Sequence, residues 1–163
     1  MSSNTTLVLM PGWRDSGPGH WQSLWAEQLP GAVRVAMAED DWQRPKRSVW
    51  VQALARTILA QTGPVVVAAH SLGCIATTHL PSEVARRIRG ALLVASTNDP
   101  YCPIRTAGAY ARSWGSEVVR LQNAAHINVE SGHGEWPLGL ALLQSLMADH
   151  AWRAQPQTEL ESA

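Results

Sequence analysis

Val65-Val66-Val67-Ala68-Ala69-His70-Ser71-Leu72-Gly73 is the stretch that decides the fold of this chain. An apolar, β-branched run ends in a small-x-Ser-x-Gly pentapeptide, a pattern that predicts a strand, a sharp turn and then a helix. Such a turn holds Ser71 at a positive φ, so the residues two before and two after it must be small, as Ala69 and Gly73 are. The pattern predicts a nucleophilic serine that stands clear of the sheet, with the backbone N–H of Leu72 placed to bind an oxyanion.

Two further polar residues follow predicted strands in the order that a catalytic triad on such a sheet requires. Asp99 lies in an Asn-Asp-Pro turn after the apolar run 91–96, and His126 follows a short strand predicted over 117–121. The order nucleophile, acid, base places each residue just past the C-terminal end of a strand, where an open α/β sheet gathers its active site. We therefore predict that Asp99 orients His126 and that His126 is the base for Ser71.

Other interpretations of these residues stay open. Asn-Asp-Pro is also ordinary turn chemistry, so Asp99 could serve only to start a turn. His70 is expected to point elsewhere because of the sharp turn, and Cys74 is interpreted as a small buried residue rather than a nucleophile. Among the other histidines, two remain as secondary contacts and two are less well placed: His20 and His133, then His79 and His150.

Predicted strands and helical segments alternate along the chain. The expected strands are residues 7–10, 33–36, 65–69, 91–96 and 117–121. Between them, apolar residues recur with helical spacing, which predicts a doubly wound, three-layer α/β domain with a mostly parallel sheet of about five strands in the order 2-1-3-4-5. We predict one compact domain over residues 1–152 and a flexible tail over 153–163, where periodicity is lost.

Composition narrows the classes of partner and compartment. The 163 residues carry 13 basic and 13 acidic side chains without a block of one sign, so we expect neither nucleic acid nor a membrane as partner. The apolar run 7–10 is too short for a signal or membrane segment, and the chain has two cysteines, so we expect a cytoplasmic protein. No motif calls for a cofactor or a resident metal.

The chain has eight tryptophans and no phenylalanine, and several tryptophans lie in loops at the expected active edge. Trp13, Trp42 and Trp136 could anchor these loops in the core or form the walls of a substrate pocket. With Gly12 and His20 they are the candidate pocket residues.

Specific motifs accompany the serine turn along most of the chain. They are Pro11-Gly12-Trp13, residues 17–25 (Gly-Pro-Gly-His-Trp-Gln-Ser-Leu-Trp), Asp41-Trp42-Gln43-Arg44-Pro45 with Trp50, residues 98–102, residues 126–132, and Trp136-Pro137. In combination they resemble the RBBP9/YdeN serine hydrolases, a compact branch of the α/β-hydrolase superfamily, over nearly all of residues 6–147. The resemblance implies an α/β-hydrolase-like fold, a triad of Ser71, Asp99 and His126, and a second oxyanion N–H from the Gly12-Trp13 loop.

One departure from that family concerns the segment between nucleophile and acid. Asp99 lies 28 positions after Ser71, room for one crossover helix and one strand, whereas the resembling family has two strands there. The run 91–96 looks like the start of one strand joined to the end of the next, so we expect that one strand-crossover unit is missing relative to that family. We expect this to bring the acid strand about 4.8 Å closer to the nucleophile strand and to leave a shallower, wetter pocket.

Other functions, such as dinucleotide, metal or pocket-protein binding, require sequence patterns that this chain lacks. Trp13 stands where a dinucleotide-binding loop needs its second glycine, and His126, Glu130 and His133 lack the spacing of a helical metal pair. Residues 72–76 lack the glutamate of a Leu-x-Cys-x-Glu motif, so binding to retinoblastoma-type pocket proteins is not expected. The main alternative is a non-catalytic binding protein in which the shortened sheet has disrupted the triad.

We therefore expect a carboxylesterase-like serine hydrolase that acts on small esters, with amides as the secondary class, through an acyl-Ser71 intermediate. The exposed edge of a shortened sheet also offers a route to oligomers.

Overall fold

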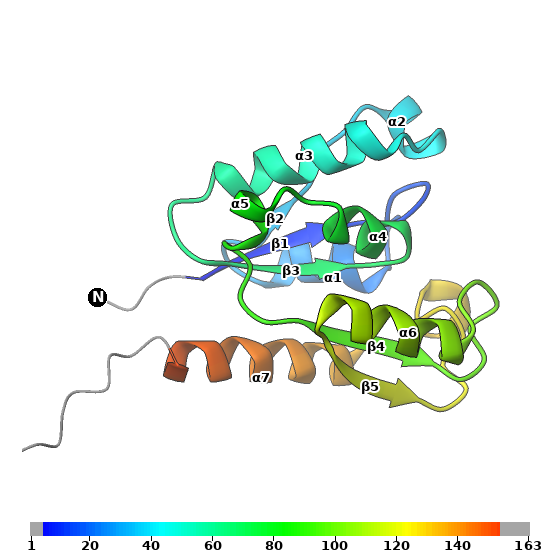
Figure 1. The fold of residues 1–163 in the computed structure, drawn as a ribbon. Helices are drawn as coiled ribbons and strands as arrows, with labels where there is room; N and C mark the ends of the chain where they lie inside the picture. Colours follow the sequence, from blue (N-terminus) through cyan, green and yellow to red (C-terminus); the bar gives the residue numbers. More distant parts are fainter. Residues whose placement is uncertain (1–4, 154–163) are drawn as a thin grey trace, which may run out of the picture.

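The computed structural model describes residues 5–153 of the chain and has the predicted α/β class (Figure 1). The elements in chain order are β1 (Thr6–Met10), α1 (Trp21–Gln28), β2 (Val33–Arg34), α2 (Glu39–Gln43), α3 (Arg47–Leu59), β3 (Val65–Ala69), α4 (Leu72–Thr78), α5 (Ser82–Ala85), β4 (Leu92–Ser96), α6 (Ile104–Trp114), β5 (Glu117–Leu121), the 3₁₀ turn η1 (Val129–Ser131) and α7 (Pro137–Arg153). Each predicted strand is present, and its bounds differ from the prediction by at most two residues. The predicted tail falls outside the described residues, apart from Arg153, which ends α7.

The five strands form two parallel sheets, not one. One sheet has the order β2-β1-β3 and the other pairs β4 with β5. Within each sheet the neighbours are those predicted, with Leu7 opposite Val66 and Leu93 opposite Val118. The predicted continuity across β3 and β4 is wrong, because no strand pairing joins them in the described chain. The expected closure of the acid strand onto the nucleophile strand therefore does not occur.

Hydrogen bonds at the start of β3 show how the two sheets diverge. The backbone N–H of Val65 donates to Arg87 O and its carbonyl accepts from Arg89 N, each at 3.1 Å, so residues 87–89 occupy the free edge of β3 at that point. The chain then turns away into β4, whose backbone pairs only with β5. One short bridge thus takes the place of a full strand between β3 and β4.

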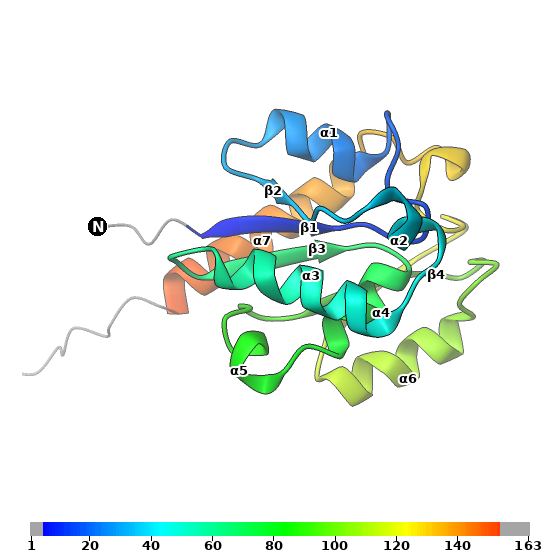
Figure 2. The same ribbon diagram turned by 90° about the horizontal axis from the view of Figure 1, so that it is seen from above.

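Side-chain alternation along β1 builds a core on each face of the three-stranded sheet. Val8 and Met10 are fully buried with α3 residues such as Leu54, whereas Leu7 and Leu9 pack with Trp21 of α1 on the other side. Figure 2, seen from above, places α3 and α1 on opposite sides of β1. Helix α7 joins the α1 side through Leu143, which completes the predicted three layers.

Strand β5 is the outer strand of the two-stranded sheet. Glu117, Val118 and Arg120 are exposed on it. Charged side chains on an edge strand oppose pairing with another chain. No helix among residues 5–153 is long and apolar enough to cross a membrane.

Candidate active site

Ser71 occupies the sharp turn between β3 and α4 that the sequence predicted. Its backbone lies at φ 53° and ψ −122°, a conformation that is strained for a residue with a side chain. Gly73 is required for the close approach of this turn to β1, because a Cβ at that position would lie 2.4 Å from Pro11 O and 2.5 Å from Met10 O. The strained turn is therefore held by contact with the end of β1.

The loop after β1 lies directly against the serine. A Cβ on Gly12 would come within 2.8 Å of Ser71 Cβ and 3.0 Å of His70 O, so only glycine fits there. The backbone N–H groups of Trp13 and Leu72, the predicted oxyanion donors, make no hydrogen bond to any other part of residues 5–153. Neither N–H group is therefore engaged within this part of the chain.

Asp99 and His126 form the ion-pair geometry expected of an acid and its histidine. His126 Nδ1 lies 2.9 Å from one carboxylate oxygen of Asp99 and 3.1 Å from the other, and both side chains are largely buried. Asp99 Oδ1 also accepts hydrogen bonds from the backbone N–H groups of Tyr101 at 2.8 Å and Cys102 at 3.2 Å. Asp99 therefore both starts the predicted turn and holds the imidazole.

Polar side chains at the end of β4 fix the loop that leads to His126. Ser96 Oγ donates to Asn98 Oδ1 at 2.8 Å and accepts from the backbone N–H of Ala124 at 2.9 Å. Asn98 Oδ1 also accepts from the N–H of Ala125 at 2.8 Å. These bonds join the acid turn to the histidine loop, which positions Asp99 relative to His126.

Two donors from the first sheet hold the other side of the histidine loop. His70 Nε2 donates to the backbone carbonyl of His126 at 2.8 Å, and Trp21 Nε1 donates to the next carbonyl, that of Ile127, at 3.0 Å. Ala125 and Ile127, on either side of His126, have positive φ values of 46° and 51°. These bonds stabilise a strained loop that carries His126.

We expected the side chain of His70 to point elsewhere because of the sharp turn, and this prediction is wrong, because His70 lines the cavity. Its ring instead packs against that of His126, with centroids 4.8 Å apart, in addition to the hydrogen bond. The one signal of this role in the sequence was a polar side chain next to the sharp turn at Ser71. That signal does not indicate which distant residue the side chain contacts in the folded protein.

Burial keeps two histidines near the site neutral. Desolvation, assisted by the positive charges that neighbouring groups would carry, lowers the pKa of His20 to about 4, and desolvation lowers the pKa of His70 to about 4 against an opposing hydrogen bond to His126 O. His20 is the N-cap of α1, where its Nδ1 accepts from the backbone N–H of Gln22. Both rings therefore act at neutral pH as uncharged structural groups.

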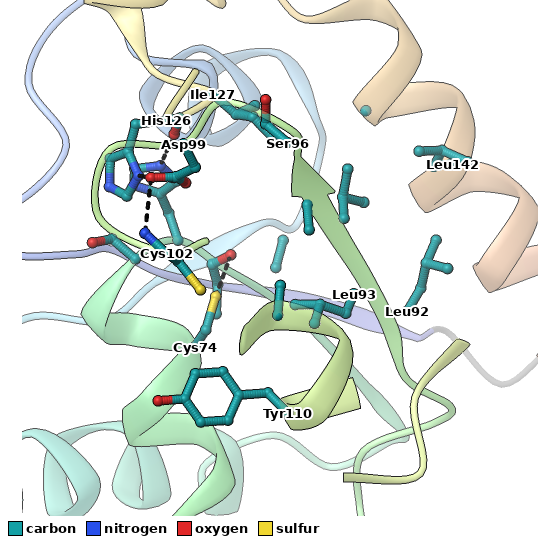
Figure 3. A pocket seen from close by; sticks show the side chains of 18 of the residues that line it. Cys74, Leu92, Leu93, Ser96, Asp99, Cys102, Tyr110, His126, Ile127 and Leu142 are labelled. Carbon is teal, nitrogen blue, oxygen red and sulfur yellow. Dashed lines mark hydrogen bonds and ion pairs between the residues drawn. The ribbon is translucent and has the colours of Figure 1, made fainter. Parts of the chain in front are cut away.

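Ser71, Asp99 and His126 line one cavity of about 390 Å³ (Figure 3). No hydrogen bond joins Ser71 to His126 among residues 5–153; the structure pairs Asp99 with His126, and Ser71 lines the same cavity. Such contacts are often long before substrate binds. Figure 3 shows Asp99 and His126 at one end of the cavity and Leu92 and Leu93 at the other.

The candidate pocket residues have different locations. Trp136 lines the cavity and packs with Trp21, whereas Trp42 is buried in the core against Trp50 and does not line it. Trp13 is half exposed and its Nε1 donates to Gln43 O. Of the other two, Gly12 supports the elbow and His20 caps α1, and neither lines the cavity.

Cys74 lines the cavity but is poorly suited to act as a nucleophile. Burial raises the pKa of its thiol to about 12, and its Sγ donates to Ala69 O at 3.3 Å. Burial and the Asp99 carboxylate also raise the pKa of Cys102. Neither cysteine forms a disulfide.

A parallel α/β fold with a serine elbow and an acid–histidine pair at the C-terminal ends of its strands defines the α/β-hydrolase class. The serine hydrolase family model matches residues 7–97 and 92–145. The chain belongs to the serine hydrolase family.

Solved structures agree with this assignment. A protein assigned as a YdeN-like hydrolase from Pectobacterium atrosepticum is 32% identical, with a TM-score of 0.81 and 93% of each chain covered. Two more distant structures, each 17% identical, share the fold. The ydeN gene product of B. subtilis has a TM-score of 0.70, with 89% of this chain and 100% of that chain covered. A protein described as a hydrolase of the α/β superfamily from Xanthomonas campestris has a TM-score of 0.58, with 90% of this chain and 99% of that chain covered. No curated protein matches this chain significantly.

The two stretches that the serine hydrolase family model matches overlap at residues 92–97. This overlap coincides with β4, the strand that borders the space between the two sheets. Residues of β3 and β4 line the cavity in that space.

Proposed function

We propose that this hydrolase cleaves small carboxylic esters through an acyl-Ser71 intermediate, with Asp99 and His126 completing a catalytic triad. Amides are the secondary substrate class. The observation that carries the proposal is the Asp99–His126 pair at 2.9 Å on the wall of the cavity into which the strained Ser71 turn opens. Family membership supports the hydrolase class, and this geometry supports the assignment of the residues.

The proposed chemistry proceeds in two acyl-transfer steps. His126 Nε2 takes the proton of Ser71 as Oγ attacks the carbonyl carbon, and the N–H groups of Leu72 and Trp13 stabilise the oxyanion. The bond to the leaving alcohol breaks, and His126 returns the proton to that alcohol. Water, deprotonated by His126, then releases the acid and regenerates Ser71. Asp99 keeps Nδ1 protonated, so that Nε2 is free to act as the base.

The experiment that tests the proposal measures intact-protein mass after exposure to a fluorophosphonate, with wild type and Ser71→Ala treated side by side. A single adduct on wild type alone, together with turnover of 4-nitrophenyl acetate that Ser71→Ala lacks, supports the activated serine. Absence of an adduct on folded wild type would favour the non-catalytic binding protein instead. Circular dichroism of both proteins verifies that they are folded.

We also propose the size of the substrate and the cellular location of this hydrolase. The substrate is a small molecule, because the serine is reached through a cavity of about 390 Å³, within the range of small-ligand pockets. We place the protein in the cytoplasm, supported by the free thiols of Cys74 and Cys102. Cell fractionation with an antibody to the protein tests this location.

A further inference from the structure

The cavity extends from Ser71 into a slot between β3 and β4 whose walls are strand edges. Residues 66–69 of β3 line one side of it and residues 92–96 of β4 line the other. At the end remote from Ser71, residues 87–89 pair with Val65, so the slot begins at Val66. Four residues of β3 span roughly 13 Å at about 3.3 Å per residue. The slot is thus as long as a short extended peptide.

Backbone groups on both walls face this slot and have no strand partner within the part of the chain that the structure describes. In β3, Pro64 and His70 bond to β1, so the alternate residues Val67 and Ala69 point their N–H and C=O groups the other way.

In β4, Ala91 O and Thr97 N bond to β5. The backbone N–H and C=O groups of Leu92, Val94 and Ser96 therefore face the slot. Among residues 5–153, Ala69 O alone of these groups has another partner, the Cys74 thiol. The slot therefore offers strand-type donors and acceptors on two sides.

The side chains above and below the slot are apolar. Ile75 of α4 and Ala107 of α6 line one face, and Leu142, Leu143 and Leu146 of α7 line the other. An extended peptide in the slot would direct alternate side chains to these two faces while its backbone meets the two strand edges. An alkyl chain would meet the apolar faces but would leave the edge groups unpaired, which is unfavourable for buried polar groups.

We infer that the acyl group of the substrate is a short, apolar, N-acylated peptide of about three residues, bound as a parallel strand between β3 and β4. This inference rests on the proposed function, because the same Ser71 performs the reaction. A peptide parallel to β3 runs towards the C-terminal end of the strands, which brings its last carbonyl carbon to Ser71. Ser71 Oγ attacks that carbon, the bond to the leaving alcohol breaks, and water then releases the peptide acid.

The test compares kcat/KM for 4-nitrophenyl esters of acetate, octanoate and N-acetyl-Ala-Val-Ala on wild-type protein. We expect the peptidyl ester to exceed both others by about tenfold or more. Depsipeptide analogues, in which one amide N–H is replaced by an ester oxygen, should lose about fivefold at the positions that face a strand edge, as expected for one hydrogen bond. Release of nitrophenolate is the readout throughout.

Two variants of α7 test the location of the peptide. Leu142→Trp places a large ring in the slot and should lower the ratio of peptidyl to acetyl kcat/KM by about tenfold. Leu138→Trp, on an exposed position of the same helix, should leave the ratio unchanged.

The outcomes separate this inference from the proposed function. Turnover of acetate with equal or better turnover of octanoate than of the peptidyl ester would overturn the peptide inference and leave the esterase standing. Equal rates for the peptide and all its depsipeptide analogues would do the same. Absence of turnover with every ester would overturn the proposed function and the inference with it.

Discussion

Replacement of Gly73 by alanine should disable the nucleophile turn, and its effect can be estimated from the structure. The added Cβ would lie 2.4 Å from Pro11 O and 2.5 Å from Met10 O, both backbone atoms that no rotamer change can move. Restoring a tolerable contact of about 3.2 Å requires the elbow to shift by about 0.8 Å. Overpacking of this kind costs about 1–3 kcal/mol of folding free energy, or roughly 2–12 °C in Tm for a domain of this size.

The displacement should affect reactivity more than stability. A nucleophile that moves by about 1 Å can lose about 100-fold in rate, so the rate constant for fluorophosphonate labelling of Gly73→Ala should fall by about that factor. The assay follows intact mass against time, with Tm measured on the same samples. Gly108→Ala is the matched control, because its Cβ would have only Arg112 Nη1 within 4 Å, at 3.7 Å, and alanine favours helix α6 by about 0.5–1 kcal/mol. Labelling of Gly73→Ala at the wild-type rate, with unchanged Tm, would refute the reasoning.

Three further predictions concern the histidines. His126→Ala should retain the fold and lose ester turnover by at least about 100-fold, and full activity in a steady-state assay would show that another residue is the base. His70→Phe should lower kcat about tenfold with little change in KM, because His126 O loses its donor at 2.8 Å. His70→Gln, which can still donate a hydrogen bond, should recover part of the loss. Equal kcat in wild type, His70→Phe and His70→Gln would exclude a positioning role for His70. The pKa values of about 4 for His20 and His70 in the folded protein lie below the unfolded value of 6.5, so the unfolded state binds more protons between these pH values. The free energy of unfolding should therefore fall as pH drops from about 6.5 towards 4, by about 2 kcal/mol per histidine between pH 7 and pH 5. Urea unfolding of His20→Asn, which keeps an N-cap but cannot titrate, should show a smaller decrease, and an identical pH dependence would contradict the assignment.

The strands and the elbow were predictable because their signals are local. The apolar run that ends at Ala69 and the small residue at Gly73 specify a strand and a sharp turn from a few adjacent side chains, and both are present. The apolar run 7–10 likewise predicted a strand, and β1 is present there between the two cores. The sequence order of Ser71, Asp99 and His126 indicated the residues that line one cavity.

The position of β4 could not be predicted in the same way. Ala91-Leu92-Leu93-Val94-Ala95-Ser96 indicated a strand, but strand neighbours depend on backbone pairing between distant segments, and the short spacing between Ser71 and Asp99 suggested closure onto β3. In the structure, β4 pairs instead with β5. Ser96 and Asn98 at its end accept hydrogen bonds from the loop that leads to His126, and Asp99 pairs with His126. These contacts hold β4 to β5 and the histidine loop, and the space left beside β3 becomes a slot and not the shallow pocket expected.

The sequence by itself determined the strand–turn–helix at Ser71, the α/β class and the order of the candidate catalytic residues, because these depend on residue type and on contacts a few positions apart. Only the tertiary structure decided that β3 and β4 stay unpaired, that Trp42 is buried in the core, and that His70 and Trp21 bind the carbonyls of His126 and Ile127. The physical reason is distance along the chain. Trp21 and Ile127 are 106 residues apart, and a hydrogen bond between such positions exists only when the fold has brought α1 and the loop around His126 together.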